Sequence, residues 1–179
     1  MKPRTAGLSC SVVLALEPFH QLRHRRRVFD DTGALAGGHA AGAPGACAGL
    51  ASGAWLFRAA NTLDPETLFT VTRDCYREML RAGITCVGEF HYVHHTPDGR
   101  PYADPNELSR QVIRAAEVVG IRLVLLAVYY ARAGAGRQPL PEQRRFCDAS
   151  VDAYLRRLDT LRGAGVHVGV APHSVRAVP

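Results

Sequence analysis

Helix-like and strand-like patterns alternate three times between residues 64 and 179. In the first unit, apolar residues recur at three- and four-residue spacing, typical of one face of a helix: Leu68, Val71, Cys75 and Met79. Asp64 and Pro65 place an N-cap before a proline at the first helical position, and Gly83 ends the helix. The run at 84–90 is rich in β-branched residues and predicts a short buried strand.

The second unit follows the same order. Asp104 and Pro105 are expected to start a helix, which Gly120 stops. Its inner face is predicted from five apolar positions: Leu108, Val112, Ala115, Ala116 and Val119. The run at 121–129 is apolar apart from Arg122 and predicts a second buried strand.

In the third unit, a helical region covers about 142–162, with a possible break near 148–150, and 166–171 is the third strand. Three helix–strand units with almost wholly apolar strands predict an α/β fold in which helices cover a parallel sheet. Both an open doubly wound sheet and a (β/α)8 barrel fit this order.

The loops after the strands help to separate these two architectures. A Rossmann-type sheet carries a glycine fingerprint after a strand. Here HYVHH follows Phe90 and PHSVR follows Ala171. We therefore predict a partial (β/α)8 TIM-type barrel of three helix–strand units over residues 55–179.

The first 54 residues differ from this regular part. Between Gly33 and Ala54, sixteen of twenty-two residues are Ala or Gly, so little side-chain area is available for burial. We expect 1–54 to be a low-complexity, poorly ordered segment. The net charge of +6 comes almost wholly from arginine, and most arginines alternate with Asp and Glu at helical spacing. Because that pattern is typical of a solvated face, we expect no nucleic-acid partner.

Composition also bears on the compartment. No apolar run reaches the roughly 18 residues that cross a bilayer, so we expect no membrane partner. The stretch from Cys10 to Leu16 resembles a signal peptide only weakly. None of the five cysteines has CxxC spacing, which argues against a disulfide framework or a thiolate zinc site. The expected location is cytoplasmic.

Functional side chains of βα barrels lie at the C-terminal ends of the strands. Those ends give three sets of candidates: Glu89 to His95; Tyr129 and Tyr130; and His173, Ser174 and Arg176. The histidines at 91, 94 and 95 could ligate a metal or act as hydrogen-bonding and loop-capping groups, and HxxHH is no standard ligand spacing. For Glu89 we favour a structural role, paired with an Arg or His, over a catalytic one. Arg176 could clamp a carboxylate or pair with a loop carboxylate.

Three segments resemble the formimidoylglutamate deiminases of the metal-dependent amidohydrolase superfamily. They are GEFHYVHHTPDGRPYADPNELS (88–109), QPLPEQRRF (138–146) and APHSVRAV (171–178), and the resemblance covers about 55–179. It implies a (β/α)8 barrel enzyme of histidine degradation, which hydrolyses N-formimino-L-glutamate to N-formyl-L-glutamate and ammonia. A divalent metal, typically zinc, generates the attacking hydroxide. By motif, Tyr92, His173 and Arg176 would contact the substrate, with Arg176 clamping a glutamate carboxylate.

This sequence also lacks motifs that the resemblance would lead us to expect. Its first metal motif, HxH, occurs nowhere in this sequence. Its later metal histidine, catalytic Glu and His, and metal Asp are expected beyond residue 179. We therefore predict no metal ligand and no catalytic residue in this chain, and no turnover by it alone. The alternative is a non-catalytic interaction protein that associates through the open edge of its sheet.

Overall fold

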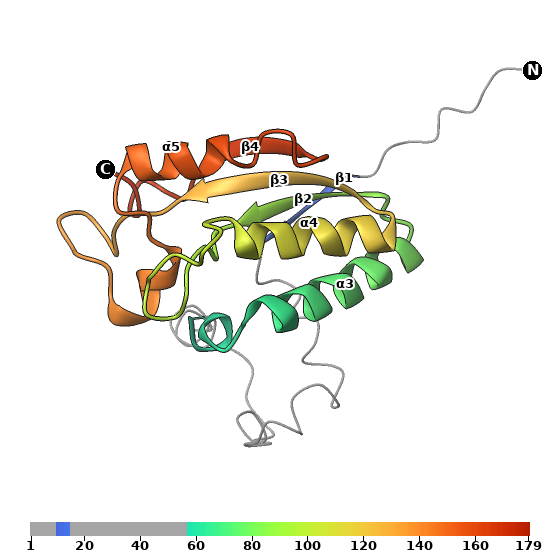
Figure 1. The fold of residues 1–179 in the computed structure, drawn as a ribbon, viewed down its shortest axis with the longest axis horizontal. Helices are drawn as coiled ribbons and strands as arrows, with labels where there is room; N and C mark the ends of the chain where they lie inside the picture. Colours follow the sequence, from blue (N-terminus) through green and yellow to red (C-terminus); the bar gives the residue numbers. More distant parts are fainter. Residues whose placement is uncertain (1–9, 15–56) are drawn as a thin grey trace, which may run out of the picture.

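The computed structural model describes residues 10–14 and 57–179. The described strands are β1 (Cys10–Leu14), β2 (Cys86–His91), β3 (Arg122–Tyr129) and β4 (His167–Pro172). The described helices are α3 (Pro65–Arg81), α4 (Glu107–Val119), the 3-10 helix η2 (Pro141–Phe146) and α5 (Val151–Asp159). The strands form one sheet in the order β1-β2-β3-β4 (Figure 1).

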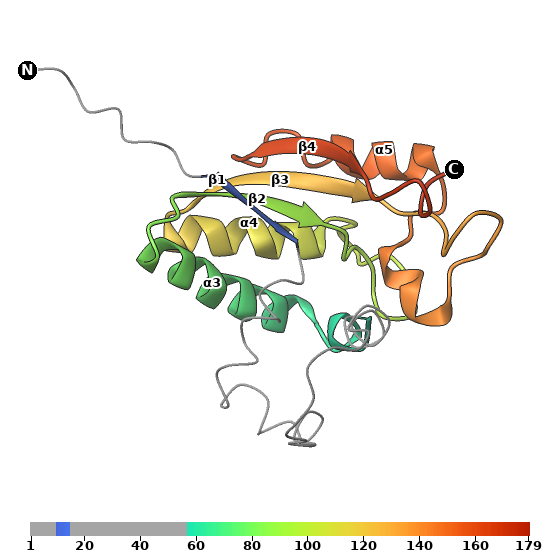
Figure 2. The same ribbon diagram turned by 180° about the vertical axis from the view of Figure 1, so that it is seen from behind.

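Every pairing in this sheet is parallel. Figure 2, seen from behind, shows the four strands side by side. The predicted α/β class and parallel sheet are therefore confirmed. The strand β1 was not predicted, and it lies within the segment expected to be poorly ordered. The rest of that segment, residues 1–9 and 15–54, lies outside the described residues.

The helix starts show where local sequence signals hold. The predicted start of α3 is confirmed, because Thr67 N donates to Asp64 Oδ1 at 2.7 Å and Asp64 N donates to Thr67 Oγ1 at 2.9 Å. The predicted start of the second helix at Asp104 is wrong. Asp104 Oδ1 instead accepts from Asn106 N at 2.8 Å within a turn, and α4 begins at Glu107.

The break predicted in the third helical region is confirmed. The 3-10 helix η2 ends at Phe146, and α5 begins only at Val151. Ser150 caps α5, since its hydroxyl accepts from Ala153 N at 3.1 Å. The loop between η2 and α5 therefore lies close to the end of β3, where Asp148 N donates to Tyr130 O at 3.0 Å.

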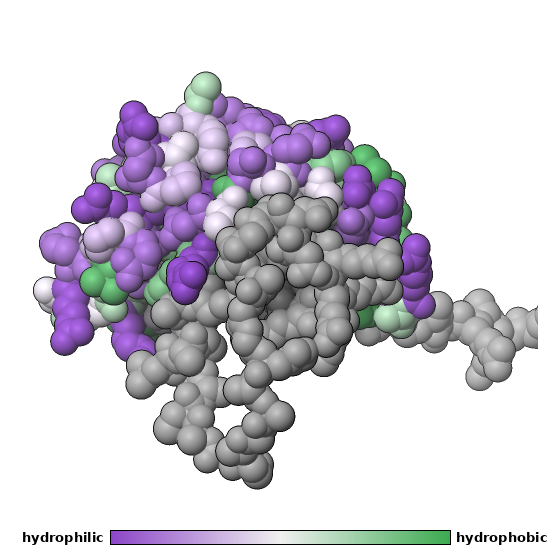
Figure 3. All heavy atoms as spheres, turned by 90° about the horizontal axis from the view of Figure 1, so that it is seen from below, coloured by the Kyte–Doolittle hydropathy of each residue, from purple (hydrophilic) through white to green (hydrophobic). Residues whose placement is uncertain are grey.

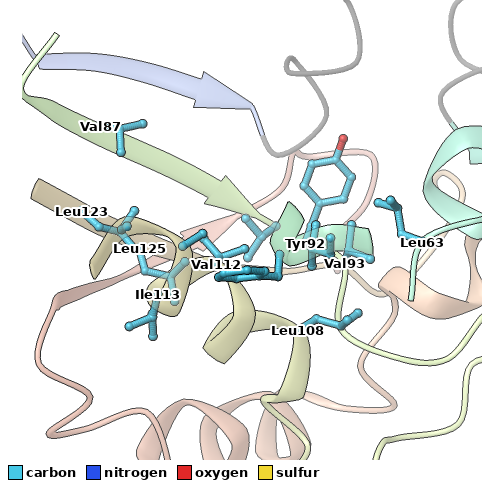
Figure 4. Close-up of a cluster of buried hydrophobic side chains, with 14 of the residues drawn as sticks. Leu63, Val87, Tyr92, Val93, Leu108, Val112, Ile113, Leu123 and Leu125 are labelled. Carbon is cyan, nitrogen blue, oxygen red and sulfur yellow. The ribbon is translucent and has the colours of Figure 1, made fainter. Parts of the chain in front are cut away.

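The core lies between the sheet and the helices α3 and α4, which pack against each other. Leu108 and Val112 of α4 belong to the same buried cluster as Val87 of β2 and Leu125 of β3 (Figure 4). Burial of these side chains provides the main favourable free energy of folding. Tyr92, just beyond β2, is also buried, and Figure 4 shows its hydroxyl directed away from Leu108.

The outer surface, unlike the core, is mostly polar. Hydrophilic residues make up most of the described surface on the face seen in Figure 3. Exposed ion pairs of this surface include Arg77 with Asp74 on α3, and Arg162 with Asp159, the last residue of α5. Within the described ranges, no helix has the length and apolar content needed to cross a bilayer.

Candidate functional site

The carboxyl ends of β2, β3 and β4 lie at the same end of the sheet, because the three strands are parallel. His173 follows β4 and is surrounded by aromatic rings from the other two strands. Its ring centroid lies 4.6 Å from that of Tyr130, 5.4 Å from that of Tyr92 and 5.9 Å from that of Phe90. Together with Phe146 of η2 these residues form what we call the strand-end group.

Residues of η2 complete this group. The ring of Phe146 lies 5.5 Å from that of Tyr92 and 6.3 Å from that of Tyr130. Gln143 Nε2 donates to the Tyr130 hydroxyl at 2.9 Å, and Gln143 is itself buried. Sequence reasoning did not single out Gln143 or Phe146, because η2 follows a loop whose path no local pattern gives.

The polar atoms of the strand-end group are held in defined states. His173 N donates to Tyr129 O at 3.0 Å, and His173 Nδ1 lies 3.3 Å from Ser174 Oγ. Burial lowers the pKa of His173, and the Arg176 charge lowers it further. Burial raises the pKa of Tyr92. Near pH 7 the site therefore presents a neutral imidazole and a protonated phenol.

Arg176 belongs to a turn that begins at Ser174, where Ala177 N donates to Ser174 O at 2.9 Å. The Arg176 side chain is exposed. Arg132, beyond β3, holds this turn: its Nε donates to Arg176 O at 3.2 Å and its Nη2 donates to Val175 O at 3.3 Å. The structure thus brings Tyr92 and His173 together and places Arg176 close enough to act on the imidazole.

The histidines at 91, 94 and 95 lie in a different environment. All three are buried, and we call them the buried histidine group. His94 Nε2 donates to Val128 O at 2.9 Å, which leaves Nδ1 unprotonated and without a partner. Burial lowers the pKa of His91 to about 3. Within the described ranges, no group of three or more His, Cys, Asp or Glu side chains could hold a metal ion.

An ion pair lies beside these histidines. Arg157 of α5 donates to both oxygens of Asp148, at 3.0 Å from Nε and 2.7 Å from Nη2, and both side chains are 3% exposed. His95 Nε2 lies 3.8 Å from Asp148 Oδ1. Arg145 donates to the backbone carbonyls of His95 and Leu63 at 3.1 Å. These contacts join the loop after β2 to α5 and to the chain before α3.

Glu89 is buried, as the sequence suggested, but its partner differs from the one expected. We expected an Arg or a His, whereas the Tyr76 hydroxyl of α3 donates to Glu89 Oε2 at 3.0 Å. Burial raises the pKa of Glu89 to about 8, and the hydrogen bond from Tyr76 opposes the shift. The side chain is directed toward α3 and does not join the strand-end group.

A family model for the amidohydrolase family matches residues 35–179. This chain belongs to the amidohydrolase family. It is 50% identical over 128 residues to the formimidoylglutamate deiminase of Pseudomonas aeruginosa, as the strand-end motifs indicated. The match covers 69% of this chain and 28% of that relative, so the chain spans little more than a quarter of the relative's length.

Solved structures place the fold in the same family. An amidohydrolase from Brucella melitensis is 37% identical, with a TM-score of 0.61, over 75% of this chain and 32% of that one. The atrazine chlorohydrolase TrzN of Arthrobacter aurescens, solved with zinc, is 21% identical, with a TM-score of 0.51, over 73% of this chain and 28% of that one. At that identity the second likeness concerns the amidohydrolase fold alone.

Proposed function

We propose that this amidohydrolase chain forms the substrate-binding part of a formimidoylglutamate deiminase barrel. The reaction of such an enzyme converts N-formimino-L-glutamate and water into N-formyl-L-glutamate and ammonia. The observation that carries the proposal is the strand-end group, in which the motif residues Tyr92 and His173 meet with ring centroids 5.4 Å apart. The 50% identity to the Pseudomonas deiminase supports the choice of substrate.

The proposed ligand is a dicarboxylate, and the three residues suit it. The guanidinium of Arg176 offers a planar fork that can bind a carboxylate bidentately. The protonated hydroxyl of Tyr92 and the neutral imidazole of His173 can each donate one hydrogen bond to an anion. The rings of Phe90 and Tyr130 lie beside His173 and lower the local polarity, which strengthens a hydrogen bond made there.

The described residues do not fit the divalent metal, zinc by resemblance, that this family implies. Imidazole suits zinc, yet His94 already donates Nε2 to a carbonyl, and the buried histidine group does not converge on a common point as a metal group. We therefore propose that residues 57–179 form part of a (β/α)8 barrel without its metal ligands. The proposal includes a cytosolic location, in line with the lack of CxxC spacing among the five cysteines of the sequence.

An ammonia-release assay tests the catalytic half of this proposal. The purified 179-residue chain, with added zinc and N-formimino-L-glutamate, should release no more ammonia than a protein-free control. The physical reason is that no three described side chains can hold the ion. Clear turnover would contradict the proposed loss of the metal centre.

A binding measurement tests the substrate half. N-formyl-L-glutamate, the stable product, should bind the chain in calorimetric titrations, and Arg176→Gln should weaken that binding at least about 10-fold, since a charged bidentate contact is lost. Arg156→Gln is the matched control, because it removes the same charge from an exposed position on α5. Equal weakening by both variants would point to the net charge and would contradict a specific clamp.

One feature supports the alternative of a non-catalytic interaction protein. β4 is the last strand of the described sheet, and its Val170 is 63% exposed. An unpaired strand edge can pair with another chain. Size-exclusion chromatography separates the two proposals: a concentration-independent monomer argues against edge pairing, whereas a dimer lost on Val170→Lys supports it.

A further inference from the structure

The imidazole of His173 is restricted on several sides by the strand-end group. Tyr130 approaches it with an interplanar angle of 66° and Tyr92 with an angle of 81°, both edge-on arrangements. Tyr130 is itself fixed, because its hydroxyl accepts from Gln143 Nε2 at 2.9 Å. The bond from His173 N to Tyr129 O fixes the backbone that carries the ring.

Ser174 is the side chain that touches the polar edge of this ring. Its Oγ lies 3.3 Å from His173 Nδ1, and it is the imidazole's hydrogen-bond partner within the described part of the chain. The backbone of Ser174 has a separate task, since its carbonyl accepts from Ala177 N and Val178 N to close the turn that carries Arg176. A substitution of the hydroxyl therefore leaves the turn's own hydrogen bonds in place.

The chemistry of the ligand decides which tautomer is useful. A neutral imidazole has one N–H donor and one acceptor nitrogen. An ionised carboxylate only accepts hydrogen bonds. If Nδ1 carried the proton, Nε2 would be an acceptor and would repel the ligand. If Ser174 donates to Nδ1, Nε2 carries the proton and can donate to the carboxylate.

We propose that Ser174 is a positioning residue, whose hydroxyl donates to His173 Nδ1 and thereby presets Nε2–H as the donor to a substrate carboxylate. The inference rests on the proposed function for the identity of the ligand. The preset tautomer itself is a property of the free chain. Ser174 acts through His173 and contacts no substrate atom.

Nitrogen NMR of the ¹⁵N-labelled full chain at pH 8 tests the tautomer directly, with His173→Gln to assign the signals. In the wild type, Nδ1 of His173 should be unprotonated and Nε2 protonated. Ser174→Ala should give a mixture of both tautomers, and Ser174→Thr, which keeps the hydroxyl, should restore the wild-type spectrum. A wild type with Nδ1–H, or an unchanged tautomer in Ser174→Ala, would overturn the proposal.

Affinity for N-formyl-L-glutamate is the second measurement on the same variants. Ser174→Ala should weaken binding about 3- to 10-fold, the range for one lost hydrogen bond, and Ser174→Thr should bind within about 2-fold of the wild type. A wild type that fails to bind this ligand, but shows the expected tautomers, contradicts the proposed function and leaves the role of Ser174 supported. Binding that is unaffected in Ser174→Ala contradicts that role and leaves the function intact.

Discussion

Two sets of histidines lie near the carboxyl ends of the strands, and they differ in burial and in hydrogen-bond partners. The buried histidine group is enclosed by protein, and His94 Nε2 donates to the carbonyl of Val128. His173 is only half-buried, with a serine on one nitrogen and aromatic rings at its sides. One set joins elements of the fold, and the other contains the imidazole that we propose as a donor to a ligand.

For His91, the difference comes from the two-residue period of the strand β2. Glu89 and His91 of β2 share the face that meets the helices, as the bond from Tyr76 to Glu89 shows. Phe90, between them, is directed to the opposite face and contacts His173. At the carboxyl end of β2, the face on which a residue lies therefore indicates its role better than its residue type does.

The largest expected effect on stability comes from removing the ion pair beside the buried histidine group. Asp148→Asn should destabilise the chain by about 3–5 kcal/mol, because it leaves the buried guanidinium of Arg157 without its counter-ion. Urea unfolding measures the loss. The remaining folded protein should bind N-formyl-L-glutamate as the wild type does.

Asp159→Asn is the matched control for that measurement. It removes the same carboxylate chemistry from the pair with Arg162, whose side chains are 81% and 62% exposed. Little change in stability is expected there, since exposed ion pairs are screened by solvent. Equal losses in both variants would contradict the special cost assigned to the buried pair.

The next effect concerns Glu89 and depends on pH. Its pKa is raised from 4.5 to about 8, so the folded state holds a proton that the unfolded state releases. The contribution of Glu89 to stability should therefore fall as pH rises from about 4.5 to 8, by up to about 1.4 kcal/mol per pH unit. Four histidines with lowered pKa values contribute the opposite slope up to about pH 6.5. The Glu89 contribution is therefore measured between pH 6.5 and 8, as the difference between the wild type and Glu89→Gln.

Glu89→Gln should remove this slope and be more stable than the wild type at pH 8. The glutamine can still accept from the Tyr76 hydroxyl but carries no charge to bury. Thermal or urea unfolding across pH 6.5–8 provides the test, with Glu117→Gln at an exposed position on α4 as the control. A wild-type slope that persists in Glu89→Gln would show that another group titrates in this window.

The sequence predicted this fold where local signals decide it and missed what depends on distant contacts. The α3 cap at Asp64 and the break before Val151 depend on residues close in the chain. The sequence also placed Tyr92 and His173 at the strand ends. It could not show that Gln143, thirteen residues after Tyr130, returns to bond its hydroxyl, nor that Asp148 pairs with Arg157. Such pairings follow from the path of a loop.

The smallest expected effect concerns ligand affinity and the turn that carries Arg176. Arg132 donates to the carbonyls of Val175 and Arg176, so it holds the turn that presents the proposed clamp. Arg132→Gln should weaken N-formyl-L-glutamate binding about 3-fold, and no more, because the backbone bonds from residues 131 and 132 to Ala177 O remain. Calorimetric titration at fixed ionic strength measures the change.

Arg137→Gln separates positioning from charge. Arg137 lies in the same loop as Arg132, is exposed, and has no side-chain hydrogen bond within the described residues. Both variants lose one positive charge, but only Arg132→Gln frees the turn. A weaker affinity in Arg132→Gln alone would show that the clamp depends on the hydrogen bonds to its backbone. Equal losses would mean that the loop attracts the dicarboxylate by its charge, and the half-buried His173 would then be the more specific of the two contacts.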